Sequence, residues 1–260
     1  MISWRSVGAA GAFLAVLLLS GFCSAAERAL LSPGEVFDYG LYFHEGPLSI
    51  PAGEARLSTS ATTCRGRSAI ALQMEVKASS IIERFYHLRT SFTSVVTPAL
   101  QSLGYVKHAE EGSRTYTESA TFDYRGENCI VSSRRSVRGG KVQTGRTVRK
   151  GRVYDLVNVC FFARVRDLDR LSRGAYFPVA VASGVSVRER RLVYHGVQMG
   201  LTAEGTRMPC HVLVLLAKDE HKRDVESARF WISRDARRMP VRIDMVLKFG
   251  TASVCLRKRR

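Results

Sequence analysis

The chain has 260 residues, 45% of them apolar, and carries 40 Lys and Arg against 23 Asp and Glu. This length and composition exclude a disordered chain, and they exclude a small domain that needs disulfides or metals to hold its core. The net charge of +17 favours anionic partners. The basic residues are nevertheless spread along the chain, so a solvated, arginine-rich surface is the simpler interpretation of that charge.

The first 26 residues have the three parts of a secretory leader. The basic Arg5 precedes an uncharged apolar stretch over residues 7–22, and small residues follow as far as Ala26. The stretch is too short to span a bilayer. We therefore predict a signal peptide over residues 1–26, cut after Ala26 or alternatively after Ala25, and an exported protein located in the periplasm or associated with the envelope.

The cysteines leave two questions open. Cys23 stands in a segment similar to a lipobox, but Phe22 occupies the position that requires a small residue, so a lipid anchor at Cys23 is the less favoured alternative. Five cysteines follow the leader: Cys64, Cys129, Cys160, Cys210 and Cys255. Their number is odd, so at least one stays free or pairs between chains. Their wide spacing gives no zinc-ligand pattern, and small buried apolar residues are the favoured interpretation.

Most of the chain after the leader alternates apolar and polar residues at the strand period. The clearest run is residues 70–78, in which Gln73, Glu75 and Lys77 separate apolar residues. Further runs occupy residues 35–44, 55–59, 87–97, 103–105, 116–124, 130–137, 176–181, 185–194, 211–216, 230–233, 240–249 and 253–256. Residues 211–216 are apolar at both parities, which predicts a central strand covered on both faces. Gly139-Gly140 gives the strongest hairpin-turn pattern.

One segment has a different period. From Leu156 onward apolar residues recur three and four positions apart, and Asp155 is a good N-cap. We predict a helix from about Asp155 to about Asp169, packed against a sheet face or plugging an opening. Together with about twelve strands, it indicates a mainly β protein: an antiparallel curved sheet or partly open β-barrel with one principal helix packed on it. We expect a single domain over residues 27–260, with its core at about residues 33–256.

The segment of residues 231–243, WISRDARRMPVRI, resembles the C-terminal signature of the DUF3108 family of exported bacterial proteins of unknown function. We call it the signature segment. Further similar pieces are Gly34-Glu35, Ala52-Gly53-Glu54-Ala55, Asp155-Leu156, Gly205 before Cys210, and Gly250 with Leu256. The resemblance implies an exported, β-rich protein without established activity or catalytic residues. It also implies a curved sheet similar in shape to periplasmic lipoprotein and lipid carriers, a likeness of fold rather than of function.

The four residues that mark the signature segment also have a physical interpretation. Trp231 supplies a large apolar body for a core, and Asp235 is suited to accept hydrogen bonds from the turn backbone. Arg238 is the basic residue of the turn, and Pro240 starts the return strand without a ladder donor. We therefore interpret Trp231, Asp235, Arg238 and Pro240 as a folding element rather than a binding or catalytic site.

No motif marks the chain as an enzyme. The six histidines have no metal-ligand spacing, and nucleophile-elbow and phosphate-loop patterns are absent. Basic residues at 134–135 and 146–152 have only Tyr154 as an aromatic neighbour, so no nucleic acid is expected as a partner. We expect no catalytic residues, metal or cofactor.

Three hypotheses for function remain. The favoured one is a non-catalytic envelope protein that binds or carries an apolar or amphiphilic ligand, such as a lipid, on a concave surface. The alternative is a structural or adaptor protein that docks on anionic envelope polymer or lipid through its basic surface. An enzyme whose site assembles from scattered residues is the third. The oligomeric state and the ligand are not determined by the sequence.

Overall fold

The computed structural model describes residues 31–248 and 250–257. The predicted signal peptide over residues 1–26, with Cys23, lies outside the described residues. Fifteen strands occur in the described part: β1 Val36–Glu45, β2 Leu48–Cys64, β3 Arg67–Ala78, β4 Leu88–Val96, β5 Ser102–Glu111, β6 Arg114–Arg125, β7 Asn128–Val137, β8 Gln143–Lys150, β9 Val153–Tyr154, β10 Tyr176–Ser183, β11 Ser186–Leu201, β12 Arg207–Lys218, β13 Asp224–Ser233, β14 Pro240–Val246 and β15 Thr251–Leu256. The helices are α2 Ser80–Glu83 and α3 Leu156–Arg164, with a 3₁₀ turn at Leu168–Arg170.

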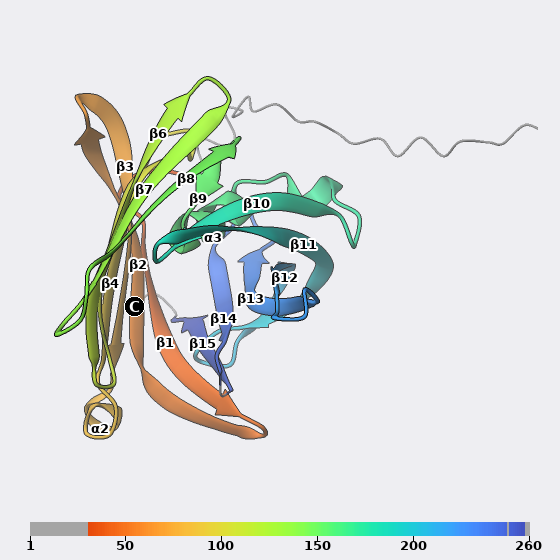
Figure 1. Ribbon diagram of the computed structural model, residues 1–260. Helices are drawn as coiled ribbons and strands as arrows, with labels where there is room; N and C mark the ends of the chain where they lie inside the picture. The colour runs from red at the N-terminus through yellow and green to blue at the C-terminus, as the bar shows by residue number, and fades with distance from the viewer. Residues whose placement is uncertain (1–30, 249, 258–260) are drawn as a thin grey trace, which may run out of the picture.

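All fifteen strands form one sheet in the order β8-β7-β6-β5-β4-β3-β2-β1-β15-β14-β13-β12-β11-β10-β9. The first strand therefore lies in the middle, and the last strand returns to pair with it, with Tyr39 opposite Leu256. Every pairing is antiparallel except that of β9 with β10. Figure 1 shows the sheet curling so that its two halves face each other, with α3 between them.

One edge of the sheet, at β8, comes close to the β10–β11 turn near the other edge, so the sheet is close to closure. The backbone of Gly145 on β8 approaches the turn between β10 and β11 so closely that a Cβ there would lie 2.2 Å from the carbonyl oxygen of Val185. The backbone N–H of Gly184 in that turn donates to Oε2 of Glu118 at 3.1 Å. The structure is thus a nearly closed, barrel-like antiparallel sheet with one principal helix, which confirms the predicted fold class.

The strand predictions hold where one face meets the core. On β3, Ile70 and Leu72 are buried while Glu75 and Lys77 point outward. On β12, all residues from Cys210 to Leu215 are buried. The inner face of β12 packs on the cluster around α3, and its outer face packs on Trp231 and Val241. The prediction of a strand covered on both faces is confirmed.

Three local predictions need correction. The helix ends at Arg164 rather than at about Asp169, and the chain continues as a 3₁₀ turn at Leu168–Arg170. Leu168 is still fully buried, so the apolar pattern continues through the change of backbone geometry. The predicted set of about twelve strands lacked β8 and β9, and α2 was not predicted. Strand β8, QTGRTVRK, has a single large apolar residue, so no apolar alternation marks it.

All five cysteines of the described part are free. Cys129, Cys160, Cys210 and Cys255 are buried, and Cys64 is partly exposed. The interpretation of these cysteines as small apolar residues agrees with this burial for four of them.

Candidate functional site

Helix α3 fills the interior of the curled sheet. It begins at its N-cap Asp155, whose Oδ1 accepts from the backbone N–H of Asn158 at 2.9 Å. All of its residues except Leu156 are buried, and it contacts β3, β4, β10 and β13. Apolar side chains on nearly every face of the helix are what this position requires, because sheet surrounds it on several sides.

Polar groups tie the first turn of α3 to the β4–β5 side of the sheet. The hydroxyl of Ser94 on β4 donates to Oδ2 of Asp155 at 2.6 Å. The amide of Asn158 donates to Oγ of Ser102 at 2.8 Å and to the carbonyl of Leu100 at 3.3 Å. Burial raises the pKa of Asp155 to about 6, against the opposing effect of the hydrogen bonds from Ser94 and the helix backbone.

An ion pair ties down the other end of α3. Nη1 and Nη2 of Arg164 each lie 2.5 Å from an oxygen of Glu35, just before β1. The same guanidinium donates to the carbonyls of Arg237 and Arg238, at 3.0 and 2.8 Å. The Arg164 side chain is 2% exposed, so its charge is compensated by these fixed partners rather than by water.

The turn of the signature segment supplies those carbonyls. Oδ1 of Asp235 accepts from the backbone N–H groups of Arg237 and Arg238, at 3.0 and 3.1 Å, and from the hydroxyl of Ser233 at 2.8 Å. Arg238 adopts a left-handed backbone with φ of 44°. Its guanidinium donates to the carbonyl of Arg166, just after α3, and to Asp169. The turn is therefore built by Asp235 and clamped onto α3 by Arg238.

The four marked residues do not form one cluster. The carbonyl of Pro240 accepts a hydrogen bond from the buried hydroxyl of Tyr39 at 2.9 Å, so Pro240 joins Asp235 and Arg238 near the end of α3. Trp231 points to the opposite face of the sheet. There its ring lies between Arg229 and Arg242, whose guanidinium carbons are 5.6 and 5.1 Å from the ring centroid.

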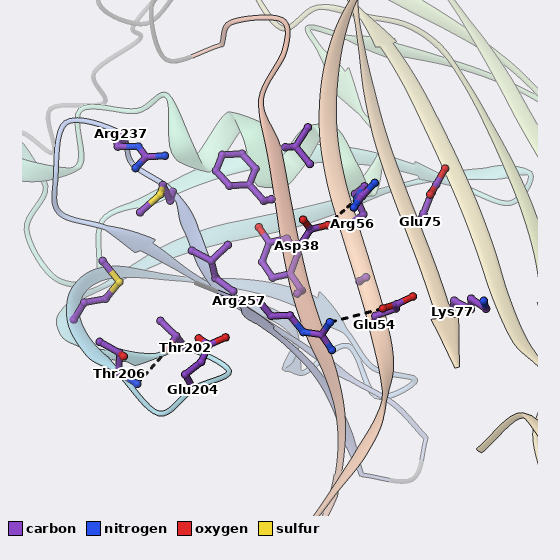
Figure 2. Close-up of a pocket in the computed structure, with 17 residues that line it drawn as sticks. Asp38, Glu54, Arg56, Glu75, Lys77, Thr202, Glu204, Thr206, Arg237 and Arg257 are labelled. Carbon is purple, nitrogen blue, oxygen red and sulfur yellow. Dashed lines mark hydrogen bonds and ion pairs between the residues drawn. The ribbon is translucent and has the colours of Figure 1, made fainter. Parts of the chain in front are cut away.

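A groove of about 1170 Å³ opens beside this turn, as Figure 2 shows. Its lining comes from β1, β2 and β3, from the β11–β12 loop, from the signature segment and from the last strand with Arg257. Its apolar lining residues are Val36, Phe37, Tyr39, Ala55, Met208, Met239 and Leu256, of which Val36, Met208 and Met239 are the ones not buried.

Charged residues of alternating sign line the groove on the outward face of β1–β3. Asp38, Arg56 and Glu75 lie opposite one another on successive strands, and Nε of Arg56 is 2.7 Å from Asp38. Next to them Glu54 lies opposite Lys77. This alternation gives no field of a single sign, so it suits a polar or zwitterionic group better than a purely anionic one.

Sequence reasoning identified Asp155 as the N-cap and Asp235 as the acceptor in its turn, and the structure shows both. It assigned no role to Glu35, to Arg164 or to the groove residues. Glu35 lay within the predicted first strand and the resemblance without an assigned role. Arg164 was visible only as a charge inside an apolar helical pattern, which is a signal for a buried ion pair. The groove residues Glu75 and Lys77 were identified as a solvent face, and nothing in their spacing marks a groove.

A second polar cluster lies under the turn. The hydroxyl of Tyr194 is 2.8 Å from Nδ1 of His211, and Nε2 of His211 is 3.4 Å from Asp169. Burial lowers the pKa of His211. His211 is 1% exposed and Asp169 is 48% exposed, so the cluster connects buried side chains of β11 and β12 to the 3₁₀ turn at the surface. In the part of the chain that the structure describes, no three potential ligand residues gather as a metal site, and no helix has the length and apolar character needed to cross a membrane.

Comparison with solved structures shows that the fold occurs in other proteins. The chain is similar to the beta-barrel-like protein of domain of unknown function DUF1849 from Brucella abortus, with a TM-score of 0.54 and 9% identity over 86% of this chain and 95% of that chain. At this identity the likeness concerns the fold alone. A search of curated proteins gave no match. The family described as "Protein of unknown function (DUF3108)" matches residues 37–257, nearly the whole described region. The chain therefore belongs to the DUF3108 family.

Proposed function

We propose that this protein is a non-catalytic, exported envelope protein that binds an apolar or amphiphilic ligand in the groove beside the signature segment. The observation that carries the proposal is the composition of that groove. It combines accessible apolar side chains with a face of alternating charges, and its volume of about 1170 Å³ is large enough for a small amphiphile.

The apolar and charged sides of the groove suit the two parts of an amphiphile. Val36, Met208 and Met239 offer flexible or branched apolar surface, and methionine adapts to ligands of varied shape. The cross-strand partners Asp38, Arg56 and Glu75, and beside them Glu54 and Lys77, offer hydrogen-bond donors and acceptors for a polar head group. The interior is a less suitable binding site, because α3 occupies it.

Two features support a non-catalytic role. Burial raises the pKa values of Asp155 and Cys160 markedly, and both side chains lie in the packed interior rather than in the groove. Catalytic groups with shifted pKa values normally face a cleft that substrate can reach. Within the groove, Asp38 and Arg56 already neutralise each other. Export itself is proposed from the N-terminal leader pattern of the sequence.

The test is to identify and then displace the ligand. Native mass spectrometry and solvent extraction of protein purified from envelope fractions should reveal a bound amphiphile. The variant Val36→Asp replaces accessible apolar surface of the groove with a second carboxylate beside Asp38 and should abolish retention of the amphiphile. Val106→Asp is the matched control, since Val106 is 40% exposed, Val36 is 36% exposed, and Val106 lies on β5 outside the groove.

Two outcomes would contradict the proposal. The first is a protein that carries no amphiphile and takes up none from added fluorescent fatty acid or lysophospholipid. The second is equal ligand retention by the Val36→Asp and Val106→Asp variants, each shown by circular dichroism to be folded.

A further inference from the structure

The end of the barrel that carries α2 exposes an unusual set of apolar side chains. Because neighbouring strands are antiparallel, the turns after β1, β3, β5 and β14 all lie at this end. Phe85 is 86% exposed and Ile81 is 69% exposed, and they lie four residues apart in the α2 segment. Exposed apolar patches of this kind mark sites of protein or membrane interaction. Figure 1 shows α2 protruding at the lower end of the view.

The α2 segment is built to hold these side chains outward. Ser79 caps the helix, and Ile82 and Leu88 pack against the core. The backbone N–H of Gly112 donates to the carbonyl of His87 at 2.8 Å. A Cβ on Gly112 would lie 2.9 Å from the ring of Tyr86, so that ring rests against the β5–β6 turn. The segment is thus anchored on its inner side while Ile81 and Phe85 remain in water.

Two other turns at the same end of the sheet also expose apolar side chains. Leu48 and Ile50 are exposed on the β1–β2 hairpin, and Val246 and Leu247 are exposed on the β14–β15 turn. These two turns lie against each other. The backbone of Gly250 approaches that of His44 so closely that a Cβ on Gly250 would lie 2.2 Å from the carbonyl oxygen of His44.

Charge at the tip favours an anionic partner. Arg84 and Arg89 are exposed beside Phe85 and Tyr86. The acidic residue of the segment, Glu83, is 40% exposed but already has partners within the segment: its Oε1 lies 2.7 Å from Nδ1 of His87, and its Oε2 accepts from the backbone N–H of Leu88 at 3.3 Å. Outward bases beside aromatic and aliphatic side chains are typical of segments that bind the membrane interface.

We propose that the α2 tip, with Ile81 and Phe85 leading and Arg84 and Arg89 at the headgroups, docks this protein on the surface of a bilayer that contains anionic lipid. The protruding shape of the α2 tip favours a bilayer over a protein as the partner. Apolar side chains on separate protruding turns enter a fluid layer that adapts to them, whereas a protein partner would need a matching set of pockets. The docking surface is separate from the groove and does not depend on its ligand.

The experiment is co-sedimentation of the purified protein with vesicles of phosphatidylethanolamine and phosphatidylglycerol, compared with phosphatidylcholine vesicles. The unmodified protein should bind the anionic vesicles. The double variant Ile81→Ser/Phe85→Ser should weaken that binding by about tenfold or more, since two large apolar side chains no longer enter the bilayer. Val148→Ser/Met199→Ser, which removes two exposed apolar side chains elsewhere, should bind as the unmodified protein does.

A fluorescent reporter gives a second readout. In Phe85→Trp the emission should shift to the blue when anionic vesicles are added, and in Met199→Trp it should not. Equal vesicle binding by the tip variant and its control, or no vesicle binding by the unmodified protein, would overturn the proposal. So would a Phe85-dependent capture of a protein without vesicle binding. The groove variant Val36→Asp should bind vesicles normally, which separates failure of this proposal from failure of the ligand proposal.

Discussion

Glu35 and Arg164 form a two-point ion pair across 129 residues of sequence, with both distances at 2.5 Å. The pair joins the start of the first strand to the end of the central helix, and the carbonyls of the signature segment complete it. Two of the pieces through which the sequence resembles the DUF3108 family, Gly34-Glu35 and the signature segment, thus meet at the end of α3. Their shared role here is to hold α3 inside the barrel.

Breaking this ion pair should destabilise the fold strongly. Glu35→Gln leaves the buried guanidinium of Arg164 without a counter-charge, and we expect a loss of about 3 kcal/mol in the free energy of unfolding. Denaturant titration followed by circular dichroism measures it. The exposed pair of Asp38 and Arg56 supplies the control, and Asp38→Asn should cost less than about 1 kcal/mol.

A double-mutant cycle sharpens the same prediction. Adding Arg164→Met to Glu35→Gln removes the unpaired charge, so the double variant should lose less stability than the two single variants summed. Additive losses would show that the ion pair contributes nothing beyond packing.

The buried carboxyl of Asp155 should make stability depend on pH. Burial holds its pKa near 6 in the folded protein, above the value of a solvated carboxyl, so the folded state binds this proton more tightly than the unfolded state. The contribution of Asp155 to stability is therefore most favourable in acid and declines as pH rises toward and through 6.

The variant Asp155→Asn tests this sign, because asparagine also caps helices and has the same shape. The unfolding free energy of the variant relative to the unmodified protein should rise by about 2 to 3 kcal/mol between about pH 4 and about pH 7. Parallel pH profiles for the two proteins would refute the assignment.

Asp235 should stabilise α3 at a distance, through the turn that it builds. Asp235→Ala removes the acceptor of three hydrogen bonds, and we expect a loss of about 1 to 3 kcal/mol together with faster amide exchange in α3. Asp219 in the β12–β13 turn is a matched control, since its Oδ1 accepts from the backbone N–H groups of His221 and Arg223. If Asp219→Ala speeds amide exchange in α3 as much as Asp235→Ala does, the turn of the signature segment does not specifically stabilise the helix.

The thiols should differ in reactivity. Burial raises the pKa of Cys160 to about 12 and that of Cys210 and Cys255 to about 11, and the thiolate is the reactive form. Cys64, which is partly exposed, should therefore be alkylated first in the native protein, as peptide mass spectrometry can show. All five should react in denaturant, and rapid native labelling of Cys160 would contradict the packed interior.

Local sequence patterns predicted much of the architecture. The predictions of one buried face on β3 and of two buried faces on β12 were confirmed. They succeeded because residues two positions apart on a strand point to the same face, so the apolar pattern of the strand itself indicates which faces are buried. The polar β8 was missed for the same reason, since its pairing with β7 and its approach to the β10–β11 turn come from neighbours rather than from its own composition. The groove could not be predicted, because its lining comes from segments more than 200 residues apart, such as Val36 and Leu256.

The sequence by itself determined the class of the fold, its family and the presence of one apolar helix, since these depend on periodicity and on short motifs. Only the tertiary structure decided that α3 lies inside the sheet, and that Glu35 rather than solvent compensates Arg164. The physical reason is that a curled sheet brings together backbone carbonyls and charges from distant strands. Their energies depend on burial and distance, which no local pattern records.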